Sequence, residues 1–199
     1  MKNELPVREI NHHHGLKAGP GFPVRLLVTL AVVPLALYLL RPILAEFMRA
    51  RAYSYAGLAR QDDALRVAAN ALRLDEKNAG NWFTMANLLT NTGNDDDRAL
   101  EAYRRGLAIQ PENGGARFDL AMLHFWRREW AAAAEQLELV RREGMPAEKA
   151  PAELQIRYRA TLMRLEHCYR ELHMAEKAED VAEEITRRFP PQVRDEPRP

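Results

Sequence analysis

The acidic run Asp95, Asp96 and Asp97 is the first place in the sequence where side chains gather that could bind a metal ion. Calcium prefers several carboxylate and carbonyl oxygens, so adjacent aspartates suggest a calcium loop. The run lacks the glycine and the distant glutamate that complete an EF-hand loop. We therefore interpret it as an acidic turn that caps the following helix and favours its positive end.

Histidines offer a second set of possible metal ligands. His12, His13 and His14 stand in a row near the N-terminus, and no cysteine or carboxylate completes a site around them. His167 and His173 lie close together in the sequence, but on a helix they do not share a face. The sequence therefore predicts no metal site and no cofactor.

Catalytic motifs are missing from the sequence. It contains no glycine-rich phosphate loop, no HExxH, no CxxC and no nucleophile elbow. Its one cysteine, Cys168, excludes an internal disulfide framework, and we expect it to be a packed, unreactive thiol. The formal net charge is +1, which is not the footprint of a nucleic-acid binder. The sequence predicts that the protein is not an enzyme and binds no nucleic acid.

The pattern of the helices is clearest between Trp82 and Pro111. Apolar side chains recur there at helical spacing in two segments, which are joined by a turn at residues 91–94. Small residues allow the two helices to approach closely, and Pro111 ends the second helix. The repeating positions are Trp82, Met85, Ala86 and Leu89 in the first helix and Ala99, Tyr103, Gly106 and Leu107 in the second.

This stretch resembles a tetratricopeptide repeat (TPR), a helical hairpin with a period of about 34 residues. The pattern returns in units near 43–76, 79–111, 114–147 and 151–190. An insertion precedes the last unit, whose first helix, from residue 152 to about residue 172, is expected to be longer than usual. The resemblance implies an all-α fold, a right-handed superhelical stack of about four hairpins. The small residue of each second helix recurs as Ala64, Ala99, Ala133 and Ala178.

An uncharged run over residues 26–40 precedes the repeats, with Arg25 and Arg41 at its two ends. Fifteen helical residues span about 22 Å, less than the ~30 Å hydrocarbon core, but flanking residues and snorkelling arginines close the gap. We expect an uncleaved transmembrane helix over residues 23–42, and Pro42 separates it from the first repeat helix. A cleaved signal peptide is the alternative, although no small-x-small site follows closely.

The remaining segments complete the expected domain organisation. Residues 1–22 and 191–199 are polar or proline-rich and are expected to be disordered tails, and the TPR-like domain covers residues 43–190. Basic residues balance on the two sides of the span. We expect a single-pass membrane protein with its N-terminus inside and the repeats on the outer, periplasm-like side.

The concave side of a TPR stack is lined by the first helix of each hairpin, and in similar proteins it holds a peptide or helix of a partner. Asn87 matches the asparagine that peptide-binding repeats use to hold a ligand backbone. Phe83 replaces the lysine of their carboxylate clamp. Carried over position by position, the resemblance predicts a partner-binding groove of Arg49, Tyr53, Phe83, Asn87, Thr90, Asn91, Phe118, Met122, Phe125, Trp126, Met163, His167 and Arg170.

Phe118, Met122 and Phe125 form an apolar stripe in this predicted groove, which either a partner or another segment of the chain covers. Basic residues toward its ends, including Arg49 and Arg170, favour a ligand with an apolar centre and acidic flanks. The sequence thus predicts a membrane-anchored scaffold, an assembly factor or adaptor for a protein partner. The alternatives are an accessory subunit of a large membrane complex, whose repeats cap a soluble subunit, and a secreted adaptor.

Overall fold

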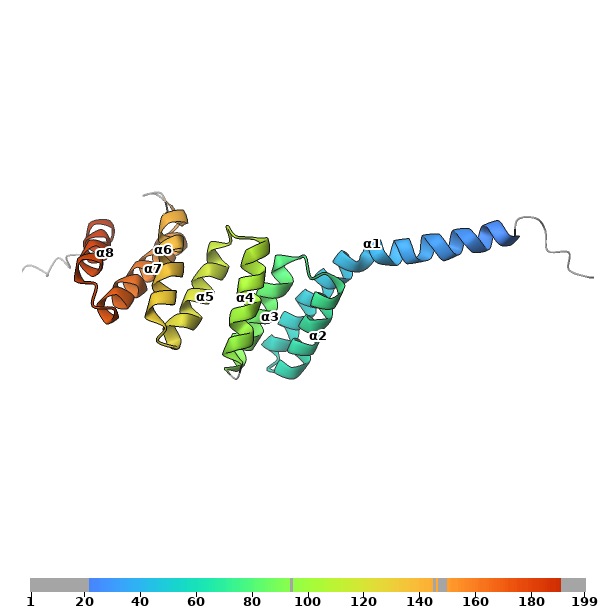
Figure 1. The fold of residues 1–199 in the computed structure, drawn as a ribbon, viewed down its shortest axis with the longest axis horizontal. Helices are drawn as coiled ribbons and strands as arrows, with labels where there is room; N and C mark the ends of the chain where they lie inside the picture. The colour runs from blue at the N-terminus through green and yellow to red at the C-terminus, as the bar shows by residue number, and fades with distance from the viewer. Residues whose placement is uncertain (1–21, 94, 145, 147–149, 191–199) are drawn as a thin grey trace, which may run out of the picture. The chain divides into compact units, whose positions relative to one another are not determined.

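The structure is a computed structural model of the 199-residue chain, and it describes residues 22–93, 95–144, 146 and 150–190. These residues form eight helices and no strand (Figure 1), so the predicted all-α class is confirmed. His12 to His14, the two predicted tails except Phe22, and most of the insertion lie outside the described residues. The chain divides into two units at residues 40 and 41.

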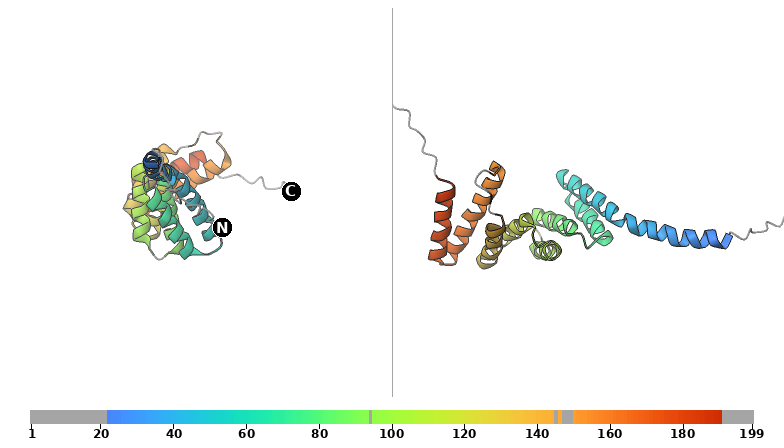
Figure 2. Two further views of the ribbon diagram at one scale, coloured as in Figure 1. Left: turned by 90° about the vertical axis from the view of Figure 1, so that its right-hand side faces the viewer. Right: turned by 90° about the horizontal axis from the view of Figure 1, so that it is seen from above.

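The helices of the second unit pack in pairs, as a stack of TPR-like hairpins does. α3 packs on α4, α5 on α6, and α7 on α8, and Figure 2 shows these hairpins from two further directions. The end of α1 shares one core cluster with α2. The bounds are α1 (Phe22–Gly57), α2 (Gln61–Leu74), α3 (Ala79–Thr92), α4 (Asp96–Ile109), α5 (Gly114–Trp126), α6 (Trp130–Glu143), α7 (Ala152–Glu171) and α8 (Ala175–Arg188).

The core follows the small-residue positions that the sequence singles out. All four second-helix alanines are buried, and each belongs to a core cluster of packed helices. One buried cluster extends from α1 to α5 and a second from α5 to α8, and α5 contributes Leu120 to the first and Ala121 to the second. Consecutive hairpins are therefore joined through α5, whose remaining side is free to form part of a binding surface.

Pro42 does not separate the span from the first repeat helix, because α1 runs through it without a break. Proline removes one N–H donor and crowds the carbonyl four residues earlier, yet the helix continues through Pro42 as it does through Pro34. Its most apolar window has a mean hydropathy of 1.7, and Leu30, Val33 and Leu37 are exposed. By length and composition this helix can cross a membrane, a test that a signal sequence near an N-terminus also passes.

Each hairpin turns through one residue in the left-handed helical region. The positive φ angles are 56° at Ala59, 65° at Gly93, 58° at Arg128 and 56° at His173. Only glycine adopts this conformation without steric cost from a Cβ atom. Three of the four turns are therefore strained at a non-glycine residue.

Ala59→Gly should raise the free energy of unfolding by about 0.5–1 kcal/mol, because it removes only the methyl group that makes this conformation costly. Ala50→Gly is the matched control, since Ala50 is exposed in the interior of α1 and the change should cost about 1 kcal/mol there. Urea unfolding of the full chain in mild detergent, followed by circular dichroism, compares the two. Equal destabilisation by both changes would contradict the strain at the turn.

A polar network fastens α8 to α6 and α7. The Nε of Arg141 in α6 donates to Oε2 of Glu184 in α8 at 2.8 Å, and the hydroxyl of Tyr158 in α7 donates to Oε1 at 2.7 Å. Arg141 also pairs with the exposed Asp180 at 2.9 Å. Burial and the bond to Glu184 raise the pKa of Tyr158 to about 12, so its hydroxyl remains a donor at neutral pH.

Candidate partner-binding groove

A cavity of about 440 Å³ opens on the inner side of the stacked hairpins. Every residue that lines it comes from the first helix of a hairpin, except Tyr103 of α4. We call this cavity the groove. Its lining residues are Tyr53 of α1, Asn87, Thr90 and Asn91 of α3, Tyr103 of α4, Phe118, Asp119, Met122 and Trp126 of α5, and Arg164 of α7.

Two asparagine caps fix where α3 and α5 begin. The side chain of Asn78 accepts a hydrogen bond from the backbone N–H of Gly80, and that of Asn113 accepts one from Ala116, both at 2.9 Å. Such caps satisfy N–H groups that the first turn of a helix leaves free. With the starting points fixed, the helical repeat brings residues 87, 90 and 91 to one face of α3, and residues 118, 119, 122 and 126 to one face of α5.

The polar side chains at the groove are held in place by hydrogen bonds. The hydroxyl of Tyr103 donates to Oδ1 of Asn87 at 2.5 Å, and burial raises the pKa of Tyr103 well above its usual range. The hydroxyl of Thr84 lies 3.2 Å from that of Tyr53, which joins α3 to α1. The bond from Tyr103 occupies the amide oxygen of Asn87, so its NH2 group is the part that can donate to a ligand carbonyl.

Aromatic side chains form the walls. Trp126 is 63% exposed and Tyr53 is 44% exposed, whereas Met122 is buried and Phe118 is partly buried. Large exposed aromatic residues beside a buried apolar floor are typical of binding surfaces, since tryptophan and tyrosine often dominate the energy of an interface. The walls can therefore bury apolar parts of a ligand.

Asp119 is a groove residue that the sequence-based prediction omits. Burial raises the pKa of its carboxyl group, and the nearby cation of Arg157 only partly offsets this effect. The carboxylate has no hydrogen bond and no ion pair to any residue that the structure describes. Its spacing from Met122 is a usable signal, because residues three apart on a helix lie on the same face.

Two predicted groove residues belong to the core instead. The ring of Phe83 fills the space beside Gly106, where an added Cβ atom would lie 2.4 Å from Cε1 of the ring. Phe125 packs edge-on against Trp130 at 5.2 Å between ring centroids and lies 5.3 Å from the ring of His167. Neither phenylalanine lines the groove, because each fills a gap between packed helices.

Four further predicted residues lie outside the groove lining. His167 contacts the Phe125 and Trp130 rings as described, and Met163 is exposed elsewhere on α7. Arg49 forms an ion pair with Glu46 one turn earlier in α1. Arg170 pairs at 2.6 Å with Glu166, one turn earlier in α7. Positive charge that the sequence assigns to the ends of the groove is thus largely neutralised within single helices.

The other candidates for chemistry have structural surroundings. Asp95 stands at the N-cap of α4, but its side chain makes no capping bond and pairs with Arg98 at 2.6 Å. Asp97 accepts from Arg127 at 2.8 Å. Cys168 is fully buried, and burial raises the pKa of its thiol to about 11, which keeps it protonated at neutral pH. No group of three or more potential metal ligands occurs in the described part of the chain.

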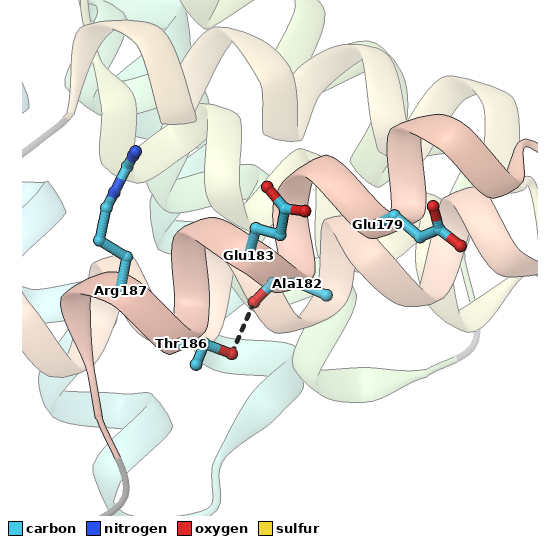
Figure 3. A pocket seen from close by; sticks show the side chains of 5 residues that line it. All are labelled: Glu179, Ala182, Glu183, Thr186 and Arg187. Atoms are coloured by element: carbon cyan, nitrogen blue, oxygen red, sulfur yellow. Dashed lines mark hydrogen bonds between the residues drawn. The ribbon is translucent and has the colours of Figure 1, made fainter.

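A second hollow, on α8, is lined by residues of that helix alone (Figure 3). Its one internal hydrogen bond runs from Thr186 Oγ1 to the carbonyl oxygen of Ala182 at 3.0 Å. Glu179, Glu183 and Arg187 give this surface its charge. A single helix cannot surround a ligand, and a polar outer face is what the terminal helix of a repeat stack requires for solubility.

Paired helices, buried small residues at each crossing and a groove along the first helices define a TPR-like helical repeat protein. No family model and no curated protein sequence matches the chain. Solved structures resemble it in fold. MamA of Desulfovibrio magneticus RS-1 is 17% identical over 73% of this chain and 76% of that chain, with a TM-score of 0.60.

Two further solved structures share the fold. The Yersinia enterocolitica type III secretion chaperone SycD, in complex with a peptide of the translocator YopD, is 19% identical over 63% of this chain and 92% of that chain, with a TM-score of 0.56. PilF of Pseudomonas aeruginosa is 15% identical over 75% of this chain and 63% of that chain, with a TM-score of 0.57. Identities this low establish the fold and nothing more.

Proposed function

We propose that this chain is a membrane-anchored scaffold that holds a partner protein in the groove, as an assembly factor or adaptor. The observation that carries the proposal is the groove, where Trp126 and Tyr53 offer exposed apolar surface beside the donor group of Asn87. Such a combination suits an extended segment, because aromatic walls bury its side chains and an amide binds its backbone. The SycD complex supports the idea that this fold can hold a peptide.

The anchor is the second part of the proposal. α1 is long and apolar enough to cross a membrane, and its apolar side chains are exposed at residues 30, 33 and 37. Side chains of this kind on an unpacked helix are stabilised by lipid rather than by water. With the N-terminus inside, the repeats lie on the outer, periplasm-like side and meet partners there.

Site-specific cross-linking in membranes of the source organism tests both parts together. A photo-reactive phenylalanine analogue at position 126 should give a cross-linked protein adduct, because this side chain lines the groove in which the partner is proposed to bind. The matched control is position 101, an exposed residue of α4 outside the groove, which should give none. The adduct should stay in the membrane pellet after alkaline washing, and the chain should keep its N-terminal residues by intact mass.

Each result has a defined meaning. Equal adducts from positions 126 and 101 would contradict binding in the groove. Release by alkaline washing, together with a mass that lacks the apolar segment, would contradict the anchor and favour a secreted adaptor. An adduct that purifies as a fixed-ratio complex of several membrane proteins would favour an accessory subunit over an assembly factor.

A further inference from the structure

The groove contains a partly buried carboxylate that has no partner among the described residues. Asp97 pairs with Arg127, and Glu184 pairs with Arg141. Asp119 has no hydrogen bond and no ion pair to any described residue, although it lines the groove. An ionised group that is partly shielded from water and unpaired is unfavourable unless a ligand compensates it.

The cations that the sequence assigns to the groove do not pair with Asp119. Arg49 and Arg170 are paired with glutamates of their own helices. Arg164 lines the groove, but its guanidinium donates to the carbonyl of Ala160 at 3.2 Å and lies over the ring of Phe118 at 5.8 Å. The arginines that would favour an acidic ligand are therefore engaged within the chain, whereas the carboxylate is available.

The partial burial of Asp119 also favours a ligand that brings a cation to the carboxylate. It raises the pKa of the carboxyl group, and the cation of Arg157 in α7 partly opposes this shift. The negative charge of Asp119 in turn helps to raise the pKa of Tyr103 on α4, which also lines the groove. A cation brought to this position by a ligand would replace part of the hydration that the carboxylate has lost.

The walls around Asp119 suit the aliphatic part of a lysine or arginine side chain. Lysine and arginine carry three or four methylene groups below the charge, and these pack on apolar surface while the charged end reaches a polar partner. Trp126 and Tyr53 are exposed aromatic residues of the groove lining, and Met122 forms its apolar floor. Aromatic faces also attract cations directly.

We infer that the groove takes a lysine or arginine side chain of its partner, with the cation on Asp119 and the aliphatic stem against Trp126 and Tyr53. The partner segment is thus basic at its centre, in contrast to the acidic ligand that the sequence alone favours. Asn87 holds the backbone of the same segment. This inference rests on the proposed function and specifies the chemistry of the partner.

Peptide selection by the full chain in mild detergent tests the inference. The probes are four mixtures of nine-residue peptides with degenerate uncharged flanks and a fixed central lysine, arginine, norleucine or glutamate. The wild-type chain should enrich lysine and arginine centres about tenfold or more over norleucine, because a charge-assisted bond in a partly dry site is worth that factor. Asp119→Asn should remove this preference, and Asp119→Glu should retain part of it.

Stability separates loss of binding from loss of folding. Asp119→Asn removes a carboxylate whose ionised form is disfavoured by burial. The melting temperature of this variant should therefore rise by about 1–3 °C, while its preference for basic peptides disappears. Trp126→Ala, in an exposed wall, should fold normally and bind all four mixtures weakly. Arg157→Gln removes the competing cation and should increase the enrichment of basic centres.

The outcomes distinguish this inference from the proposal on which it rests. Enrichment of glutamate or norleucine centres that Trp126→Ala abolishes and Asp119→Asn leaves unchanged would overturn the basic partner and leave the groove intact. Enrichment that neither variant affects, or no enrichment of any mixture by the wild-type chain, would overturn both. A lower melting temperature for Asp119→Asn would show that the carboxylate is part of the fold rather than a site kept open for a ligand.

Discussion

Glu184→Ala should lower the free energy of unfolding by about 2–4 kcal/mol. Glu184 is only 7% exposed and accepts hydrogen bonds from Arg141 at 2.8 Å and Tyr158 at 2.7 Å. Its removal leaves the Tyr158 hydroxyl without its acceptor in a buried place and leaves the guanidinium of Arg141 partly unpaired. The loss stays below that of a fully buried pair because Arg141 is 20% exposed and keeps Asp180 as a partner.

Asp180→Ala is the matched control for this prediction. Asp180 binds the same guanidinium at 2.9 Å, but its side chain is 68% exposed, and such surface pairs contribute at most about 1 kcal/mol. Urea unfolding of the full chain in mild detergent, monitored by helical circular dichroism, measures both variants. Equal losses would show that Glu184 contributes no more than a surface charge and that α8 is held by apolar contacts alone.

The hairpin arrangement could be predicted from the sequence because it depends on local patterns. Helical spacing of apolar residues and the return of one small residue, such as Ala64 and Ala99, specify both the helices and the faces that meet. The long α7 of 20 residues is confirmed for the same reason. Pro42 misled the prediction of the helix boundary, because α1 continues through it despite the N–H donor that proline lacks.

The details of the groove and of the core were harder to predict, because they depend on contacts between residues distant in the sequence. Family positions place Phe83 in the groove, but the missing side chain at Gly106 leaves a space that the ring fills. Arg141 and Glu184 are 43 residues apart, so neither indicates the other in the sequence. Asp119 is notable only once the structure shows that no described cation pairs with it.

Gly106→Val is expected to cause the second large loss of stability, because the Phe83 ring fills the space beside residue 106. A Cβ atom at residue 106 would lie 2.4 Å from Cε1 and 2.6 Å from Cδ1 of the Phe83 ring, and the ring is itself buried between α3 and α4. Because the ring is buried and the added atom would overlap it, either the helices must separate or the ring must move. We expect a loss of about 2–3 kcal/mol in the free energy of unfolding.

A double-mutant cycle shows whether the Phe83 ring causes this loss. Phe83→Ala alone costs stability because it leaves a cavity, but Gly106→Val should cost much less in the Phe83→Ala background, since the valine then occupies vacated space. Gly114→Val is the control for backbone effects, because no atom lies within 4 Å of a Cβ placed at that residue. If Gly106→Val is equally destabilising with and without the Phe83 ring, the strain arises from the α4 backbone, and the close approach of α3 and α4 does not depend on a glycine at position 106.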